Sequence, residues 1–315
     1  MSPETHRIAA TKSLLLLAMA IVLPLAACRK VDKPSYGLYA SPNMAGEALL
    51  EAGKSGDQSR LIAIFGPDSK ELISSGDAVQ DKAVVNRFVA AYGVMHRWRK
   101  LDDNAQVLLV GPDNYALPIP LKKNDAGQWY FDVAAGKDEV LSRRVGRNEL
   151  AVMAACNALA DAQAEYFSLR HGDGSTHQYA LKFISDPGTQ NGLYWEPVGN
   201  QPVSPLGPGV AFATTEGYSK NPNSPVPFHG YYFHMLTSQG NHAPGGAKDY
   251  VVEGKMTGGF ALVAYPVEYG NSGVMTFMIS QSGLLLQKDL GKATTETAAA
   301  MSQFDPDDSW RSAQQ

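Results

Sequence analysis

The feature that most limits the fold of this chain is a series of β-rich runs between residues 228 and 289, separated by turn residues. The runs read FHGYYFHML, GGFALVAYP, GVMTFMIS and LLLQKD. Aromatic and β-branched residues favour strands. The short link from Ser280 to Gly283 is typical of a hairpin, because glycine adopts a positive φ angle without strain. The pattern therefore predicts an antiparallel sheet in this part of the chain.

An amphipathic segment precedes these runs. In RNELAVMAACNALADAQAEYFS, residues 147–168, apolar side chains recur at helical spacing, and Gln163 alone interrupts the stripe. Cys156 lies in the middle of that stripe, with no basic side chain within one turn to activate it. We therefore interpret Cys156 as a buried core residue; the alternative is a reactive thiol. The segment predicts a long helix packed on the sheet.

The first half of the mature chain shows the same order of helices followed by strands. Helical spacing covers residues 45–65 and 69–100, with a Gly-Pro break between them. Three strands are expected in AQVLLVG, YALPIPLKK and GQWYFDVA, which together predict an antiparallel meander. The fold class is therefore α+β.

This order divides the chain into units. We predict an N-terminal α+β unit at 44–145, a second α+β unit at 146–291, and a C-terminal helix and tail at 292–315. The link AAGKDEVLSRRVGRNEL contains no Pro-rich or Ser-rich spacer. A continuous helix is therefore expected to join the two units rigidly.

The N-terminus carries the pattern of an export signal. Arg7 and Lys12 precede an apolar run at 14–25, which is too short to span a bilayer. Leu-Ala-Ala-Cys at 25–28 resembles a bacterial lipobox, which implies cleavage before Cys28 and lipidation of its thiol. We predict a signal peptide at 1–27 and a lipidated tether at 28–43. The alternative is an ordinary signal peptide cut nearby, with Cys28 left as a free thiol.

The predicted location follows from the lipobox. A lipid on one cysteine holds a protein at a membrane surface without spanning it, so the membrane is the first expected partner. Position 29 is Arg and not Asp. By resemblance to Gram-negative sorting signals, this favours an outer-membrane lipoprotein that faces the periplasm.

The charge of the mature chain excludes one class of partner. The sequence has 27 basic and 31 acidic residues, and removing residues 1–27 takes away Glu4, Arg7 and Lys12. The remaining 25 basic and 30 acidic residues give a net charge of −5. A nucleic-acid partner is therefore not expected.

Two resemblances can be stated at this point. Residues 147–168, then HGYYFHM, then the hairpin with Pro266, Gly270, Gly273, Phe277 and Gly283 occur in an order that resembles the globular head of type IV pilins and pseudopilins. The resemblance implies a helix packed on an antiparallel sheet. A lipobox replaces the polymerising stalk of pilins, which argues against a filament subunit.

The second resemblance covers nearly the whole mature chain. NGLYW, SPLGP, EGY, YGNSGVMTF and QKDLG, with the segment at 230–266, resemble a proteobacterial family of secreted proteins that carries a domain of unknown function. This resemblance implies no catalytic residue.

Catalytic and metal motifs are weak. His229 and His234 are five residues apart, so on one strand they would point to opposite faces. Asp249, Glu253 and Glu268 could supply a glycosidase pair if a cleft held two of them together, and surface acids are the alternative. We therefore expect no catalytic residue, no cofactor and no metal site.

Aromatic residues on long loops give the predicted binding surface. The Pro-rich segment 186–227 and the Gly-rich turn 238–248 are polar and aromatic, and loops of this kind often carry recognition. The candidate residues are Tyr194, Trp195, Tyr218, Tyr231 and His242. Packing of the aromatic rings in the core is the alternative.

Two functions remain open. The first is a non-catalytic binding or assembly module for an envelope polymer or an envelope protein complex. The second is a periplasmic hydrolase that acts on envelope glycan or peptide. Two clustered carboxyls, or a hydroxyl beside a histidine in a cleft, would favour the hydrolase.

Overall fold

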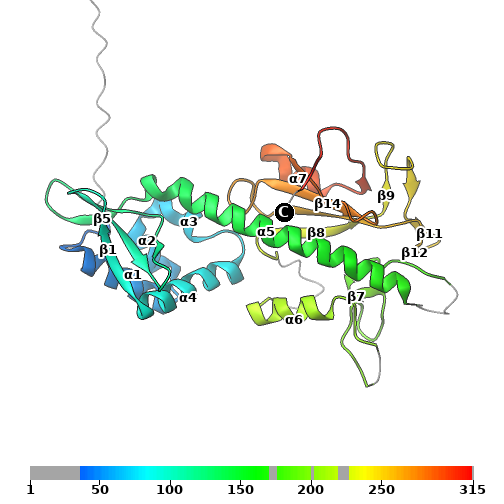
Figure 1. Ribbon diagram of the computed structural model, residues 1–315, viewed down its shortest axis with the longest axis horizontal. Helices are drawn as coiled ribbons and strands as arrows, with labels where there is room; N and C mark the ends of the chain where they lie inside the picture. Colours follow the sequence, from blue (N-terminus) through cyan, green and yellow to red (C-terminus); the bar gives the residue numbers. More distant parts are fainter. Residues whose placement is uncertain (1–35, 170–175, 200–201, 219–226, 314–315) are drawn as a thin grey trace, which may run out of the picture. The chain divides into compact units, whose positions relative to one another are not determined.

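The computed structural model describes residues 36–169, 176–199, 202–218 and 227–313. The predicted signal peptide, Cys28 and most of the predicted tether lie outside these residues. Pro34–Gln315 forms one compact unit. Helices and mainly antiparallel sheets make it an α+β fold, as predicted (Figure 1). None of the helices in the described ranges combines the length and the hydropathy that crossing a bilayer requires.

The first predicted helix is divided in two. Helix α1 spans Pro42–Ser55, and helix α2 spans Gln58–Phe65. Gly56 ends α1 in the left-handed conformation (φ 67°), and the Asp57 carboxylate accepts a hydrogen bond from Ser59 N to begin α2. Glycine is common just after the end of a helix and aspartate is common at the start of one, so the pair Gly56-Asp57 ends one helix and begins the next.

The second predicted helix, at 69–100, requires a correction. The structure has a 3₁₀ turn η1 at Pro67–Ser69, helix α3 at Lys70–Ile73, helix α4 at Ala78–Val94 and strand β1 at His96–Lys100. Gly76 has a positive φ angle of 85°, and Asp77 caps α4. The last five residues form a strand because strand β2 provides them with backbone partners, with Trp98 opposite Leu108.

The predicted meander is confirmed. It contains β2 at Ala105–Val110, β3 at Tyr115–Ala116, β4 at Leu121–Lys123 and β5 at Trp129–Phe131. The sheet order is β1-β2-β4-β5, all antiparallel, and β3 pairs with β2. The run YALPIPLKK forms two strands instead of one. Pro118 and Pro120 lie between them, and proline cannot donate to a ladder.

Helix α5 spans Val133–Ser168, so it continues without a break through the predicted boundary between residues 145 and 146 (Figure 1). Cys156 is fully buried on it, as predicted. Gln163 is also fully buried. Its amide nitrogen donates to Ala180 O (2.9 Å), and its amide oxygen accepts from Ala180 N (2.8 Å). Gln163, the polar residue in the apolar stripe, therefore has both its amide nitrogen and its amide oxygen hydrogen-bonded to the backbone of Ala180.

The predicted second sheet is confirmed, with all four expected strands. They are β8 at Tyr231–Leu236, β13 at Ala261–Pro266, β14 at Met275–Ser280 and β15 at Leu286–Asp289, and β17 at Arg311–Ser312 is added at one edge. The order is β17-β15-β14-β13-β8, and every pair is antiparallel. Gly283 closes the predicted hairpin with φ 73°. Cys156, Leu262 and Phe277 join α5 and this sheet in one core.

Smaller elements complete the fold. They are β6 at Lys182–Ile184, β7 at Gly192–Tyr194, α6 at Gly207–Glu216, β9 at Ser238–Gln239, β10 at Lys248–Asp249, β11 at Val251–Val252, β12 at Lys255–Met256, η2 at Gly291–Ala293, α7 at Thr294–Ala299 and β16 at Gln303–Phe304. The predicted C-terminal helix is therefore short, because residues 303 and 304 pair with β9 instead. Trp310 packs in the core cluster with Leu236 and Phe304 and is only 9% exposed.

Candidate ligand-binding cavity

The aromatic residues of the predicted binding surface lie in the interior. Tyr194, Trp195, Tyr218 and Tyr231 are exposed by only 7%, 4%, 6% and 0%. Their polar atoms are used internally, as when Trp195 Nε1 donates to Pro202 O (3.0 Å). Rings of this size stabilise most when they are buried. The prediction that these four side chains form an exposed surface is therefore corrected in favour of core packing.

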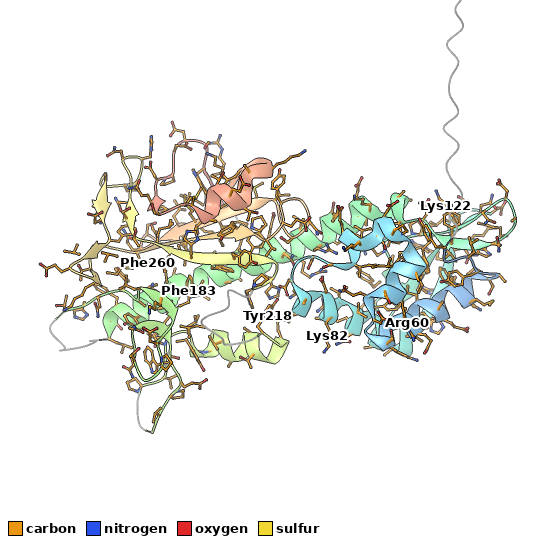
Figure 2. All side chains as sticks on the ribbon, turned by 180° about the vertical axis from the view of Figure 1, so that it is seen from behind. Arg60, Lys82, Lys122, Phe183, Tyr218 and Phe260 are labelled. Carbon is orange, nitrogen blue, oxygen red and sulfur yellow. The ribbon has the colours of Figure 1, made fainter. Side chains whose placement is uncertain are left out.

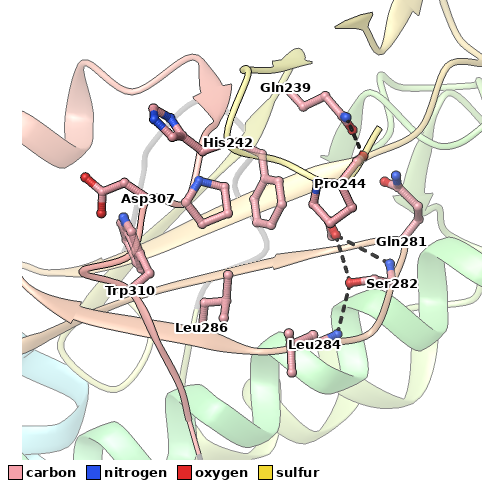
Figure 3. Close-up of a pocket in the computed structure, with 12 residues that line it drawn as sticks. Gln239, His242, Pro244, Gln281, Ser282, Leu284, Leu286, Asp307 and Trp310 are labelled. Atoms are coloured by element: carbon pink, nitrogen blue, oxygen red, sulfur yellow. Dashed lines mark hydrogen bonds between the residues drawn. The ribbon is translucent and has the colours of Figure 1, made fainter. Parts of the chain in front are cut away.

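His242 is the exposed member of the predicted surface. Its side chain is 60% exposed, and Nδ1 lies 3.0 Å from Asp305 Oδ2. This hydrogen bond raises the pKa of His242. The pKa of Asp305 is lowered first by the backbone N–H of His242, which donates to Asp305 Oδ1 (2.8 Å), and then by the ring hydrogen bond. His242 lines a cavity of about 260 Å³. Figure 3 shows Leu284, Leu286 and Trp310 among the residues that line it.

None of the three candidate catalytic acids lines this cavity. Asp249 lies on β10, Glu253 in the turn between β11 and β12, and Glu268 after β13, and all three are exposed. No group of three or more His, Cys, Asp or Glu side chains in the described ranges could hold a metal ion. His229 precedes β8, and His234 Nε2 contacts Met301 O (2.8 Å).

A larger cavity, of about 470 Å³, lies in the N-terminal half of the compact unit. Helices α1 to α5 and the segment from β2 to Ile119 supply its walls. The apolar lining includes Leu49, Leu61, Phe65, Leu72, Ile73, Val84, Val85, Phe88, Val110, Leu117, Ile119 and Val140. The volume is within the range of small-molecule sites in proteins, about 300–1,000 Å³.

Helix α4 leaves an apolar face towards this cavity. Only Gln80 and Tyr92 are buried among its 17 residues. Val84 is 41% exposed, although it belongs to the apolar stripe of the helix. Val84, Val85 and Phe88 all line the cavity. Apolar side chains at helical spacing normally pack against protein, so the incompletely buried stripe indicates a surface for an apolar ligand.

Four arginines line the same cavity, and two of them are held by protein groups. Arg143 Nε lies 2.6 Å from Glu139, and its guanidinium stacks on Tyr115 at 5.0 Å. Arg144 is buried and donates to the carbonyl oxygens of Glu71 and Leu72 and to Asn271. Burial lowers the pKa of Arg144. These two side chains therefore fix α5 in place.

Arg87 on α4 and Arg147 on α5 differ from that pair. Both are exposed and line the cavity. Within residues 36–169, 176–199, 202–218 and 227–313, no hydrogen bond or ion pair holds either guanidinium. Partial desolvation lowers the pKa of Arg147, and the like charge of Arg87 lowers it further. Two unpaired cations beside an apolar wall favour an anionic ligand.

One acid also lines the cavity. Both oxygens of Asp81 accept from Ser75 N, at 3.0 and 3.2 Å. Burial raises the pKa of Asp81, and the hydrogen bonds from Ser75 and the charge of Arg144 oppose that shift. Four arginines and one aspartate line the cavity, so basic side chains outnumber acidic ones there.

A buried polar network adjoins the cavity at Gln80. Its amide nitrogen lies 2.7 Å from His229 Nδ1, and His229 Nε2 lies 3.1 Å from Glu216. Burial lowers the pKa of His229, although Glu216 opposes the shift. Neighbouring Tyr218 donates to Asp77 at 2.8 Å, beside the start of α4 (Figure 2). These bonds join α4 to α6 and to the start of β8.

Sequence reasoning missed this cavity. The available signal was the run SRRVGRNEL, which places Arg143, Arg144 and Arg147 on neighbouring turns of one expected helix. We interpreted the run only as a link between units. The contribution of Arg87 could not be read from the sequence, because it depends on how α4 packs beside α5.

Fold and site together define an α+β protein with an apolar, arginine-lined cavity. Residues 37–313 match the family described as "Protein of unknown function (DUF2950)", and the chain belongs to this family. No curated protein and no solved structure matches the chain.

Proposed function

We propose that this protein is a lipid-anchored envelope protein that binds an amphiphile in the arginine-lined cavity, without catalysis. The observation that carries the proposal is the cavity of about 470 Å³, whose lining combines apolar side chains with Arg87 and Arg147. An apolar chain would cover the face of α4, and a polar head would meet the cations. This keeps the predicted binding role and moves it from exposed loops to an interior site.

The predicted location is part of the same proposal. The basic start, the apolar run and Leu-Ala-Ala-Cys support a signal peptide and lipidation at Cys28. Arg29 supports an outer-membrane lipoprotein that faces the periplasm. A protein anchored there has single-chain lipids within reach. The proteobacterial origin and the relation to pilin heads stay proposals supported by the sequence motifs alone.

The hydrolase alternative has less support. The ring hydrogen bonds of His229, His234 and His242 go to an amide, a carbonyl or a carboxylate. Acyl transfer by a serine or threonine needs a base beside the hydroxyl. Binding is therefore the better-supported function.

The test measures binding of a neutral monoacylglycerol labelled with a fluorophore at the end of its chain. The full-length protein is held in a nonionic amphipol. In Val84→Trp the indole occupies part of the cavity beside the apolar face of α4, and we expect the affinity to fall at least about tenfold, or roughly 1.4 kcal/mol. Val94→Trp is the matched control, because Val94 is 72% exposed on the same helix and does not line the cavity. Equal binding by the two variants, or none by the wild type, would refute the proposal.

A further inference from the structure

The four cavity arginines divide into two kinds. Arg143 and Arg144 are held by protein acceptors, as described above. Arg87 and Arg147 come from different helices, line one cavity and lack such acceptors among the described residues. A side chain that fixes the fold normally meets its partner within the fold. Arg87 and Arg147 are therefore the pair available to a ligand.

The two free guanidiniums place a requirement on the charge of the head group. Each carries a full positive charge, and together they repel each other. A carboxylate brings one negative charge, whereas a phosphomonoester brings about −1.5 to −2 at neutral pH, with three acceptor oxygens. The planar guanidinium fork also matches phosphate oxygens in bidentate geometry. A phosphomonoester is the head group that can satisfy both arginines at once.

We propose that the natural ligand is a single-chain amphiphile with a phosphomonoester head, held by Arg87 and Arg147, with its chain along the apolar face of α4. This inference rests on the proposed function and names the class of its ligand. Val84, Val85 and Phe88 contact the chain.

Asp81 sets the direction of the ligand in the cavity. It lies six residues before Arg87, or about 9 Å along the axis of α4 at 1.5 Å per residue. Both oxygens of Asp81 accept from Ser75 N, and a carboxyl group offers a phosphate no counterpart to a guanidinium. The head group is therefore placed at the end with Arg87 and Arg147, and the chain extends along the helix towards its start.

The experiment compares three competitors with the same acyl chain, used below the concentration at which they form micelles. They are lysophosphatidic acid, the free fatty acid and the monoacylglycerol, each displacing the fluorescent monoacylglycerol from the full-length protein. We expect lysophosphatidic acid to compete at concentrations at least about tenfold lower than the other two, because charge-assisted hydrogen bonds to both arginines are stronger than neutral ones.

Single variants test whether Arg87 and Arg147 cause the preference for the phosphate head group. Arg87→Gln and Arg147→Gln should each bring the ratio of phosphate to neutral affinity close to one. Lys82→Gln is the control, because it removes one positive charge from the exposed side of the same helix, outside the cavity (Figure 2). Lys82→Gln should retain the full ratio. An Arg87→Lys variant, which keeps the charge and loses the fork, should give an intermediate ratio.

The outcomes separate this inference from the proposed function. If the monoacylglycerol binds and the phosphate has no advantage, the head-group inference is overturned and the proposed function stands. The same holds if the fatty acid competes as well as lysophosphatidic acid, or if the preference survives in both arginine variants. If no competitor and no probe binds, the proposed function and the inference fail together.

Discussion

Asp77 holds three segments of the chain through one carboxylate. Oδ1 accepts from Val79 N and Gln80 N at the start of α4, and Oδ2 accepts from Tyr218 Oη (2.8 Å) and Gly230 N (2.9 Å). The residue is 1% exposed. Because every donor converges on one acceptor group, these bonds depend on a side chain that only accepts.

We predict that Asp77→Asn destabilises the protein by about 2–4 kcal/mol, since its amide group would face the donors of Tyr218 and Gly230 and leave them unsatisfied. Urea unfolding measures the change. Asp57→Asn is the matched control, because Asp57 is an exposed cap of α2 that accepts hydrogen bonds from nearby Ser59, and asparagine caps equally well. Its unfolding midpoint should stay nearly unchanged. Similar losses in the two variants would show that Asp77 acts only as a cap.

Cys156 is interpreted at the same scale. It is fully buried in the core that α5 forms with the second sheet. Burial raises its pKa, because the thiolate would lose its hydration. A reactive cysteine needs the opposite conditions, so its position agrees with a packing role.

Among the elements, α5 connects the two halves of the compact unit. Its N-terminal half carries Arg143, Arg144 and Arg147, and its C-terminal half packs on the second sheet. Arg144 donates both to Leu72 O, on α3, and to Asn271, in the loop between β13 and β14. Asn148 donates to Ser272 O (2.9 Å). Because α5 contacts both halves, unfolding of one half would remove contacts that stabilise the other.

We predict a single cooperative unfolding transition for the wild type, with equal calorimetric and van't Hoff enthalpies. Gly146→Pro should divide it into two, because proline removes a helical hydrogen bond and clashes with the preceding turn, at a cost of about 3 kcal/mol. Gly146→Ala is the control. A Cβ at Gly146 meets open space, so alanine should raise stability by up to about 1 kcal/mol. Two resolved peaks in the wild type would contradict the prediction.

At the scale of the whole molecule, the proposed anchor would determine where the cavity works. A lipid on Cys28 would keep the compact unit at a membrane surface. The tether at 28–43 can reach about 50 Å if it is extended. Anchoring and amphiphile binding are therefore consistent with each other.

We predict that radiolabelled palmitate is incorporated into the wild-type protein and not into Cys28→Ser. Cys156→Ser is the control, since it changes the other of the two cysteines in the sequence and should label as well as the wild type. Labelling is followed by immunoprecipitation and autoradiography. Equal incorporation into all three proteins would exclude lipidation at Cys28.

The sequence alone determined the α+β class, the four main strands of the second sheet and the long helix with buried Cys156. These depend on local periodicity, which is readable over a few residues. It did not reveal that His96–Lys100 forms a strand, because that result depends on pairing with β2. It also gave no ground for choosing between exposure and burial for Tyr194 and Trp195, since an aromatic ring suits a core and a contact surface equally.

Only the tertiary structure decided the candidate site. Arg87 and Arg147 are 60 residues apart in the sequence, and they meet at one cavity because α4 and α5 pack near each other. An arginine can bind a ligand only if nearby backbone carbonyls and carboxylates do not already accept its hydrogen bonds. The positions of those acceptors therefore decide which arginines are available. Those positions are set by contacts between distant elements, and such contacts leave no periodic pattern in the sequence.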